Sequence, residues 1–137
     1  MANVKLGTKA VGSIVKIKVN GASKDFIVVQ QGNPNTSTYD SSCAGTWLLM
    51  KDIYTTSTFG NNNSYKDSSI HTYLNGTFYN LIDSNIRAAI KQVKIPYQNG
   101  AGSGGSLATG SNGLSTKVFL LSGYEVGWTT SDNGCFP

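Results

Sequence analysis

The sequence predicts a small α+β domain, in which an N-terminal β-hairpin and two short helices pack on a small, mostly antiparallel sheet and long polar loops join the elements. Three observations predict this class. Hydrophobic residues alternate with polar ones near the N-terminus, recur at helical spacing in the middle of the chain, and form short unbroken runs elsewhere. A chain of 137 residues suffices for one domain with a modest core.

The hairpin is expected in residues 12–31. Val15, Ile17 and Val19 alternate with two lysines, which is the period of a strand with one wet face. The dipeptide Asn20-Gly21 favours a hairpin turn because both residues tolerate positive φ. Residues 24–31 are the expected return strand, which makes the turn a few residues longer than the tightest form. Residues 1–11 precede the hairpin as a short arm.

The first helix is expected soon after residue 67. An N-cap at Asp67, Ser68 or Ser69 precedes a set of apolar residues that share one helix face, namely Ile70, Tyr73, Leu74 and Phe78. Asn75-Gly76 is expected to stop or interrupt this helix.

The second helix is expected after Asp83 or Ser84, either of which is a suitable N-cap. Its apolar face follows the i, i+3, i+4, i+7 rule and consists of Ile86, Ala89, Ile90 and Val93. Pro96 closes it.

The remaining segments are short apolar runs and polar loops. Residues 46–51 and 117–122 are continuously apolar enough to be buried strands, and Trp47 is a core residue. Residues 98–116 are rich in Gly and Ser and are expected to form a flexible surface loop. Residues 12–137 are therefore expected to be a single domain.

The composition is polar but poor in charge. Charged residues make up 13%, against about 25% in typical domains, while Ser, Thr, Asn and Gly supply about two fifths of the chain. The net charge of +4 comes from scattered lysines and one arginine, Arg87, so nucleic acid is not an expected partner. No apolar run approaches the ~20 residues of a membrane span, and the opening residues contain no signal-peptide stretch. We expect synthesis in the cytoplasm and no membrane insertion.

The sequence offers no catalytic set. His71 is the only histidine, and neither a nucleophile nor an orienting acid is spaced near it. Cys43 could meet His71 only through the fold. Cys43 and Cys135 lie far apart and form either one disulfide or, as a reducing cytosol favours, two free thiols.

Two groups of residues are candidates for binding. The best candidate ligands for Ca²⁺ are Glu125, Asp132 and Asn133, and a simple turn without a bound metal is the alternative explanation for them. No other cofactor is expected. Aromatic rings beside amide groups suit sugars or protein surfaces, whereas core packing is the alternative explanation. The residues in this second group are Tyr97, Tyr124, Trp128 and Asn133.

Several segments together resemble the DUF6273 group of bacterial and bacteriophage domains. The resemblance runs from about Gly12 to Trp128 and depends mainly on SSIHTYLNGTFYNLID (68–83) and FLLSGYEVGW (119–128). It implies a C-type-lectin-like fold, similar to that of formylglycine-generating-enzyme relatives and phage receptor-binding proteins. Trp-rich and closing strands that follow in such proteins are absent here, so we expect an incomplete fold. Sister subunits or other virion proteins would then cover its exposed edges.

These observations and the resemblance lead to a functional expectation. We expect a non-enzymatic structural or adhesion module of a bacteriophage or prophage virion, in the tail, the baseplate or the capsid decoration. It would act through protein contacts, on the virion or at the cell exterior. The alternatives are a carbohydrate-binding module that recognises a host-surface glycan and, with less support, a relative of the formylglycine-generating enzymes.

Overall fold

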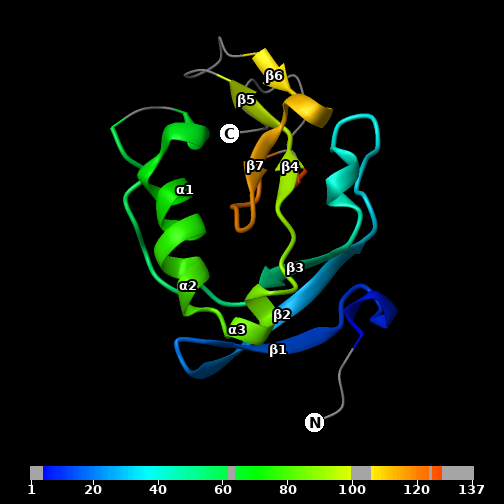
Figure 1. Cartoon of the computed structure of the whole chain (residues 1–137), viewed down its shortest axis with the longest axis vertical. Coiled ribbons are helices and arrows are strands. Elements are labelled where there is room, and N and C mark those ends of the chain that lie inside the picture. Colours follow the sequence, from blue (N-terminus) through cyan, green and yellow to red (C-terminus); the bar gives the residue numbers. More distant parts are fainter. Residues whose placement is uncertain (1–4, 62–63, 100–105, 124, 128–137) are drawn as a thin grey trace.

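The computed structural model describes residues 5–61, 64–99, 106–123 and 125–127. The chain has an α+β fold, as the sequence predicts. A three-stranded sheet lies at one end, two-stranded sheets lie toward the other, and a helix runs between these ends along one side (Figure 1). Short 3₁₀ helices lie in the connections, at Leu6–Thr8, Ser41–Cys43, Tyr65–Asp67 and Gly110–Asn112.

The three-stranded sheet contains the predicted hairpin. Strands β1 (Ile14–Val19), β2 (Ala22–Gln31) and β3 (Thr46–Met50) pair antiparallel in this order. Asn20 and Gly21 have φ angles of 51° and 75°, which a tight two-residue hairpin turn requires at both positions. The expectation of a longer turn is wrong, because Ala22 already pairs with Val19.

The first predicted helix is longer than expected. Helix α1 (Ser69–Tyr73), a π-helical turn (Leu74–Phe78) and helix α2 (Tyr79–Leu81) follow one another without a break. Ser68 caps its N-terminus, because the hydroxyl accepts a hydrogen bond from the His71 N–H at 3.1 Å. Asn75-Gly76 is predicted to stop or interrupt this helix: the stop is wrong, whereas the α-helical pattern is interrupted there by the π-helical turn. The Asn75 amide donates to the His71 carbonyl of its own helix and also bonds to the chain near residue 117, and the helix widens locally instead of ending.

The second predicted helix is shorter than expected. Helix α3 (Ser84–Arg87) begins at the predicted cap, where Asp83 Oδ1 accepts from the Asn85 N–H at 3.0 Å. It does not continue to Val93, which belongs to a strand and pairs with Thr116. The strand pairing satisfies the backbone there, and this tertiary contact outweighs the helical spacing of the apolar residues.

The last third of the chain contains strands where a loop is predicted. β4 (Val93–Ile95) pairs with β7 (Leu114–Thr116), and β5 (Tyr97–Asn99) pairs with β6 (Ser106–Ala108). The flexible loop predicted over 98–116 is therefore wrong for its described part. The strand predicted at 117–122 is also wrong, because β7 ends before it and the segment forms no ladder.

The apolar side chains form two clusters. The first lies among β3, β4, β5 and β7 and contains Tyr39, Cys43, Tyr65, Ile95, Tyr97 and Leu114. The second lies between the hairpin and the helix and contains Ile17, Val19, Phe78 and Ile82. Trp47 packs against the first cluster, as predicted for a core residue, with its ring edge-on to Tyr39 and Phe119.

The N-terminal arm is held against the end of β2 in its described part. Gln31 Nε2 donates hydrogen bonds to the carbonyl oxygens of Leu6 at 3.0 Å and Lys9 at 2.7 Å. In the described part of the chain, no helix combines the length and apolar character that crossing a bilayer requires.

Candidate functional site

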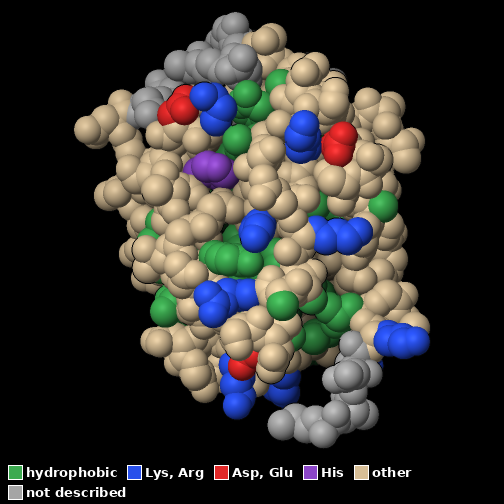
Figure 2. Space-filling model, viewed as in Figure 1, with side chains coloured by type: hydrophobic (Ala, Val, Ile, Leu, Met, Phe, Trp, Pro, Cys, Tyr) green, Lys and Arg blue, Asp and Glu red, His purple; other side chains and the backbone are tan. Residues whose placement is uncertain are grey.

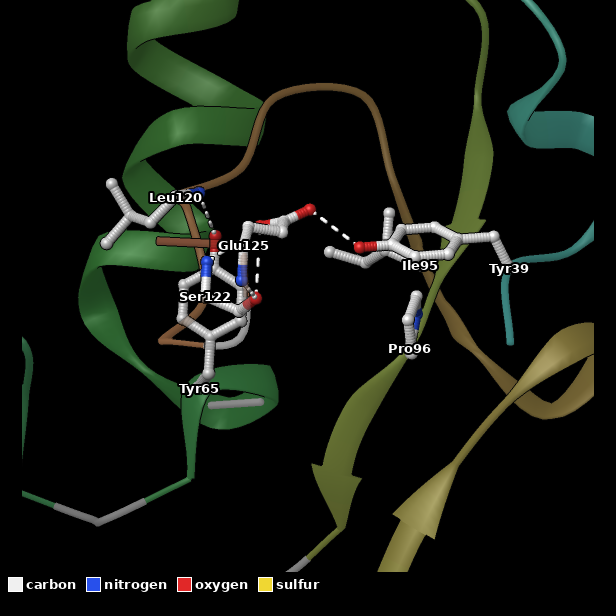
Figure 3. A pocket seen from close by; sticks show the side chains of 7 residues that line it. All are labelled: Tyr39, Tyr65, Ile95, Pro96, Leu120, Ser122 and Glu125. Carbon is white, nitrogen blue, oxygen red and sulfur yellow. Dashed lines mark hydrogen bonds between the residues drawn. The ribbon is translucent and has the colours of Figure 1, made fainter. Parts of the chain in front are cut away.

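A small hollow lies beside the first apolar cluster. Figure 3 shows its lining, in which Glu125 extends toward Tyr39 and Ile95 on one side while Ser122 and Tyr65 lie on the other. Its volume of about 10 Å³ is close to that of a single water sphere. This hollow is too small for an organic ligand.

Glu125, one of the predicted calcium ligands, already has protein partners in this hollow. One carboxylate oxygen accepts from the Tyr39 hydroxyl at 2.8 Å, and the other accepts from the Ser122 N–H at 2.7 Å (Figure 3). Within the residues that the structure describes, no three His, Cys, Asp or Glu side chains gather closely enough to hold a metal ion. Asp132 and Asn133 lie outside those residues. The described part of the predicted metal set therefore acts as a tie between distant segments.

The predicted ligand-binding residues are described only in part. Tyr97 lies in the first apolar cluster with 8% of its surface exposed, which fits the packing alternative. Tyr124, Trp128 and Asn133 lie outside the described residues, so the carbohydrate site built on them stays a prediction.

The larger hollow is an open groove between the helix and β7. It has a volume of about 260 Å³. The helix contributes one wall, β7 and the residue after it contribute the other, and one residue before β4 completes the groove. Its lining residues are His71, Asn75, Tyr79, Gln92, Ser115, Thr116 and Lys117.

Asn75 holds the two walls of the groove together. Its Oδ1 accepts from the backbone N–H groups of Lys117 at 2.8 Å and Val118 at 3.2 Å, and from the Thr116 hydroxyl at 3.1 Å. Its Nδ2 donates to the Val118 carbonyl at 2.8 Å. Residues 117–118 have no strand partner because β7 ends before them, and the Asn75 side chain satisfies their backbone groups instead.

The sequence contains a signal for this wall that our site prediction missed. His71, Asn75 and Tyr79 are spaced at i, i+4 and i+8, so they form one polar stripe on the helix. The partners of the stripe are about forty residues away in the chain, and nothing in the local sequence points to them.

Lys117 supplies the positive charge of the groove. Its ammonium nitrogen lies 4.7 Å from the centre of the Tyr79 ring and donates to the Tyr79 hydroxyl at 3.2 Å. None of the described residues that line the groove is an Asp or a Glu. Figure 2 shows the histidine and several Lys and Arg side chains on one face, where each acidic side chain in view lies beside a basic one.

His71 lies at the groove, where its surroundings favour the neutral imidazole. Burial lowers the pKa of its imidazole below the usual 6.5, although Asp67 acts in the opposite direction. The ring meets Tyr65 edge-on, with 5.1 Å between the ring centres. Its Nδ1 lies 3.4 Å from Asn75 Nδ2, so the ring offers hydrogen-bonding capacity without adding charge.

Cys43 lines neither hollow. It is 2% exposed in the first apolar cluster, where its thiol donates to the Lys94 carbonyl at 3.3 Å. Burial raises the pKa of the thiol, and Asp40 raises it further. Neither hollow therefore brings Cys43 and His71 together. Cys135 lies outside the described residues.

Comparison with known proteins yields one match. The family model described as "Domain of unknown function (DUF6273)" matches residues 44–135. No curated protein and no solved structure matches the chain, so the lectin-like part of the fold prediction stays a prediction. The family model covers both walls of the groove and more than half of the sequence, and the chain therefore belongs to the DUF6273 family.

Proposed function

We propose that this domain is a non-enzymatic structural or adhesion module, a virion component of a bacteriophage or prophage, which acts through contacts with sister subunits. The resemblance to phage domains supports the virion assignment. The observation that carries the contact function is an apolar row on the outer face of the three-stranded sheet.

The apolar row crosses all three strands at one level. Ile14 of β1 is opposite Ile27 of β2, which is opposite Leu49 of β3. These side chains point away from the second apolar cluster, because Val15, Phe26 and Met50 on the alternate positions pack into it. Ile14 is 48% exposed. Apolar rows of this kind on a sheet face are typical of interaction surfaces.

The polar residues beside the row favour a second copy of the chain as the partner. Lys16 Nζ forms an ion pair with Asp25 at 2.7 Å across the same face. A two-fold axis along the strands, between β1 and β2, would place Ile14 of one copy over Ile27 of the other. It would also place Lys16 over Asp25. The face is therefore complementary to itself, as a symmetric dimer requires.

Sedimentation and light scattering over a concentration series test this contact. We expect self-association that Ile14→Lys weakens, because the substitution puts a charge into the row. Ile53→Lys is the matched control, since Ile53 is 89% exposed and lies outside the sheet. A chain that stays monomeric at every concentration, or that responds equally to both substitutions, contradicts the contact.

The virion assignment has a separate test. We expect the gene to lie among capsid, tail or baseplate genes. A neighbourhood of metabolic genes would contradict the assignment and leave the self-contact to be judged on its own data.

A further inference from the structure

The groove between the helix and β7 is suited to a ligand, and the proposed assembly function does not use it. Its volume of about 260 Å³ lies just below the roughly 300–1,000 Å³ of typical ligand pockets. A water molecule takes about 30 Å³ of liquid volume. The groove therefore suits a small molecule and is too large for a single ordered water.

The charge of the lining favours an anion with one negative charge. Among the residues that the structure describes, Lys117 is the only charged member of the lining, because the others are amides, hydroxyls, a phenol and His71, whose lowered pKa favours the neutral imidazole. Its ammonium has the Tyr79 hydroxyl and ring as neighbours, and no carboxylate lies within ion-pair distance of it among the described side chains. A phosphate dianion is a poorer match, because such groups favour guanidinium forks or several cations.

The neutral members of the lining favour a ligand that carries hydroxyl groups. Gln92 and Ser115 offer amide and hydroxyl groups, and Ser115 is exposed at the groove. His71 adds a ring nitrogen, and Tyr79 adds an aromatic ring. Amide, hydroxyl and aromatic groups together are suited to an amphipathic ligand with several hydroxyls.

We propose that this groove binds a sugar acid, whose carboxylate contacts the Lys117 ammonium and the Ser115 hydroxyl while its ring hydroxyls contact Gln92 and His71. The site combines residues that are more than forty positions apart in the chain. Neither the fold nor the assembly function assigns it.

Amide NMR titration of the full chain tests the proposal. The probes are glucuronate, galacturonate and N-acetylneuraminate, with glucose and acetate as controls at equal ionic strength. We expect at least one sugar acid to shift the amide signals of Ser115, Thr116 and Lys117 saturably. Glucose lacks the charge and acetate lacks the hydroxyls, so each should bind at least about tenfold more weakly. Absence of saturable shifts with all three acids, or equal binding of a control, overturns the proposal.

Two lysine variants separate a local contact from general charge. Lys117→Gln should weaken binding about tenfold or more, because it removes a charge-assisted hydrogen bond. Lys24→Gln is the matched control, since Lys24 also lies near a tyrosine ring, 6.0 Å from the centre of Tyr54, but not in the groove. Equal loss in both variants would overturn the assignment to this groove.

A serine variant keeps the test independent of folding. Ser115 is exposed, so Ser115→Ala should leave the spectrum dispersed and still weaken binding several-fold. Unchanged binding in a folded Ser115→Ala protein would overturn the proposed carboxylate contact.

Discussion

Replacing Asn75 by alanine should destabilise the protein more than any other single amide substitution on this helix. The substitution removes the acceptor of the Lys117 and Val118 N–H groups and the donor to the Val118 carbonyl. Once Asn75 Oδ1 is removed, the Thr116 hydroxyl, which lies 3.0 Å from this carbonyl, can donate its single proton to it. Two backbone N–H groups therefore lose their partner.

The magnitude follows from those two groups. A buried donor without a partner costs about 1–3 kcal/mol, and the half-burial of residues 117 and 118 puts each near the lower end of that range. Alanine regains roughly 0.5 kcal/mol of helix propensity. The two donors together cost about 2–3 kcal/mol, and after the gain in helix propensity the expected loss in the free energy of unfolding is about 1.5–2.5 kcal/mol.

Urea denaturation followed by circular dichroism measures this loss. Asn80→Ala is the control on the same helix, because Asn80 is exposed and its oxygen accepts only from Arg87 Nη1 in the described contacts. That variant should lose less than about 1 kcal/mol. If Asn75→Ala stays within about 0.5 kcal/mol of the original protein, Asn75 does not hold the two walls together.

Three further predictions concern single residues. Gly21→Val should destabilise by about 1–2 kcal/mol in urea denaturation, because position 21 has a φ of 75°; an unchanged midpoint would contradict the assigned turn. The lowered pKa of His71 means that the unfolded chain binds more protons, so stability should fall as the pH drops below 6.5. His71→Gln should reduce that slope, and a slope that stays the same would refute the assignment. Cys43 should resist thiol reagents in the native protein and react after unfolding in urea, as peptide mapping can measure, because burial raises its pKa. Fast native labelling would contradict this.

Local sequence patterns predict the hairpin because its determinants are local. The alternation in β1 sets the buried face, and Asn20-Gly21 supplies the positive φ angles of the turn. β3 is predicted for a similar reason, because residues 46–50 form a short, unbroken run of large side chains, which favours a buried strand.

The C-terminal strands escape prediction because each has only three residues. Such a strand presents a single period of alternation, and β6 follows a Gly-rich stretch that is typical of loops. Val93 shows the opposite error, because its spacing fits a helix while its partner Thr116 lies more than twenty residues away. In both cases the strand is determined by pairing with a segment far away in the chain, which local sequence patterns do not show.

The candidate groove escapes prediction for the same reason. Asn75 precedes a glycine, and an Asn-Gly pair in a helix pattern normally marks an end. Its amide acts instead on residues 116–118. The sequence shows that His71 has no catalytic partner near it in the chain. Its spacing from Lys117 gives no sign that the two residues line the same groove.

The two proposed surfaces are carried by different elements, so each can fail alone. The apolar row belongs to β1, β2 and β3, whereas the groove belongs to the helix, Gln92 and the chain from Ser115 to Lys117. The helix packs against both apolar clusters, because Ile70 contacts the first cluster and Phe78 belongs to the second. Asn75 lies between these residues in the chain and ties the helix to residues 117–118. A ligand held by Lys117 contacts a wall that the folded chain provides, and it should therefore raise the free energy of unfolding with the logarithm of one plus the ratio of its free concentration to its Kd. Ile14→Lys should leave that increase intact while it weakens self-association, whereas Asn75→Ala should diminish it together with the stability of the fold.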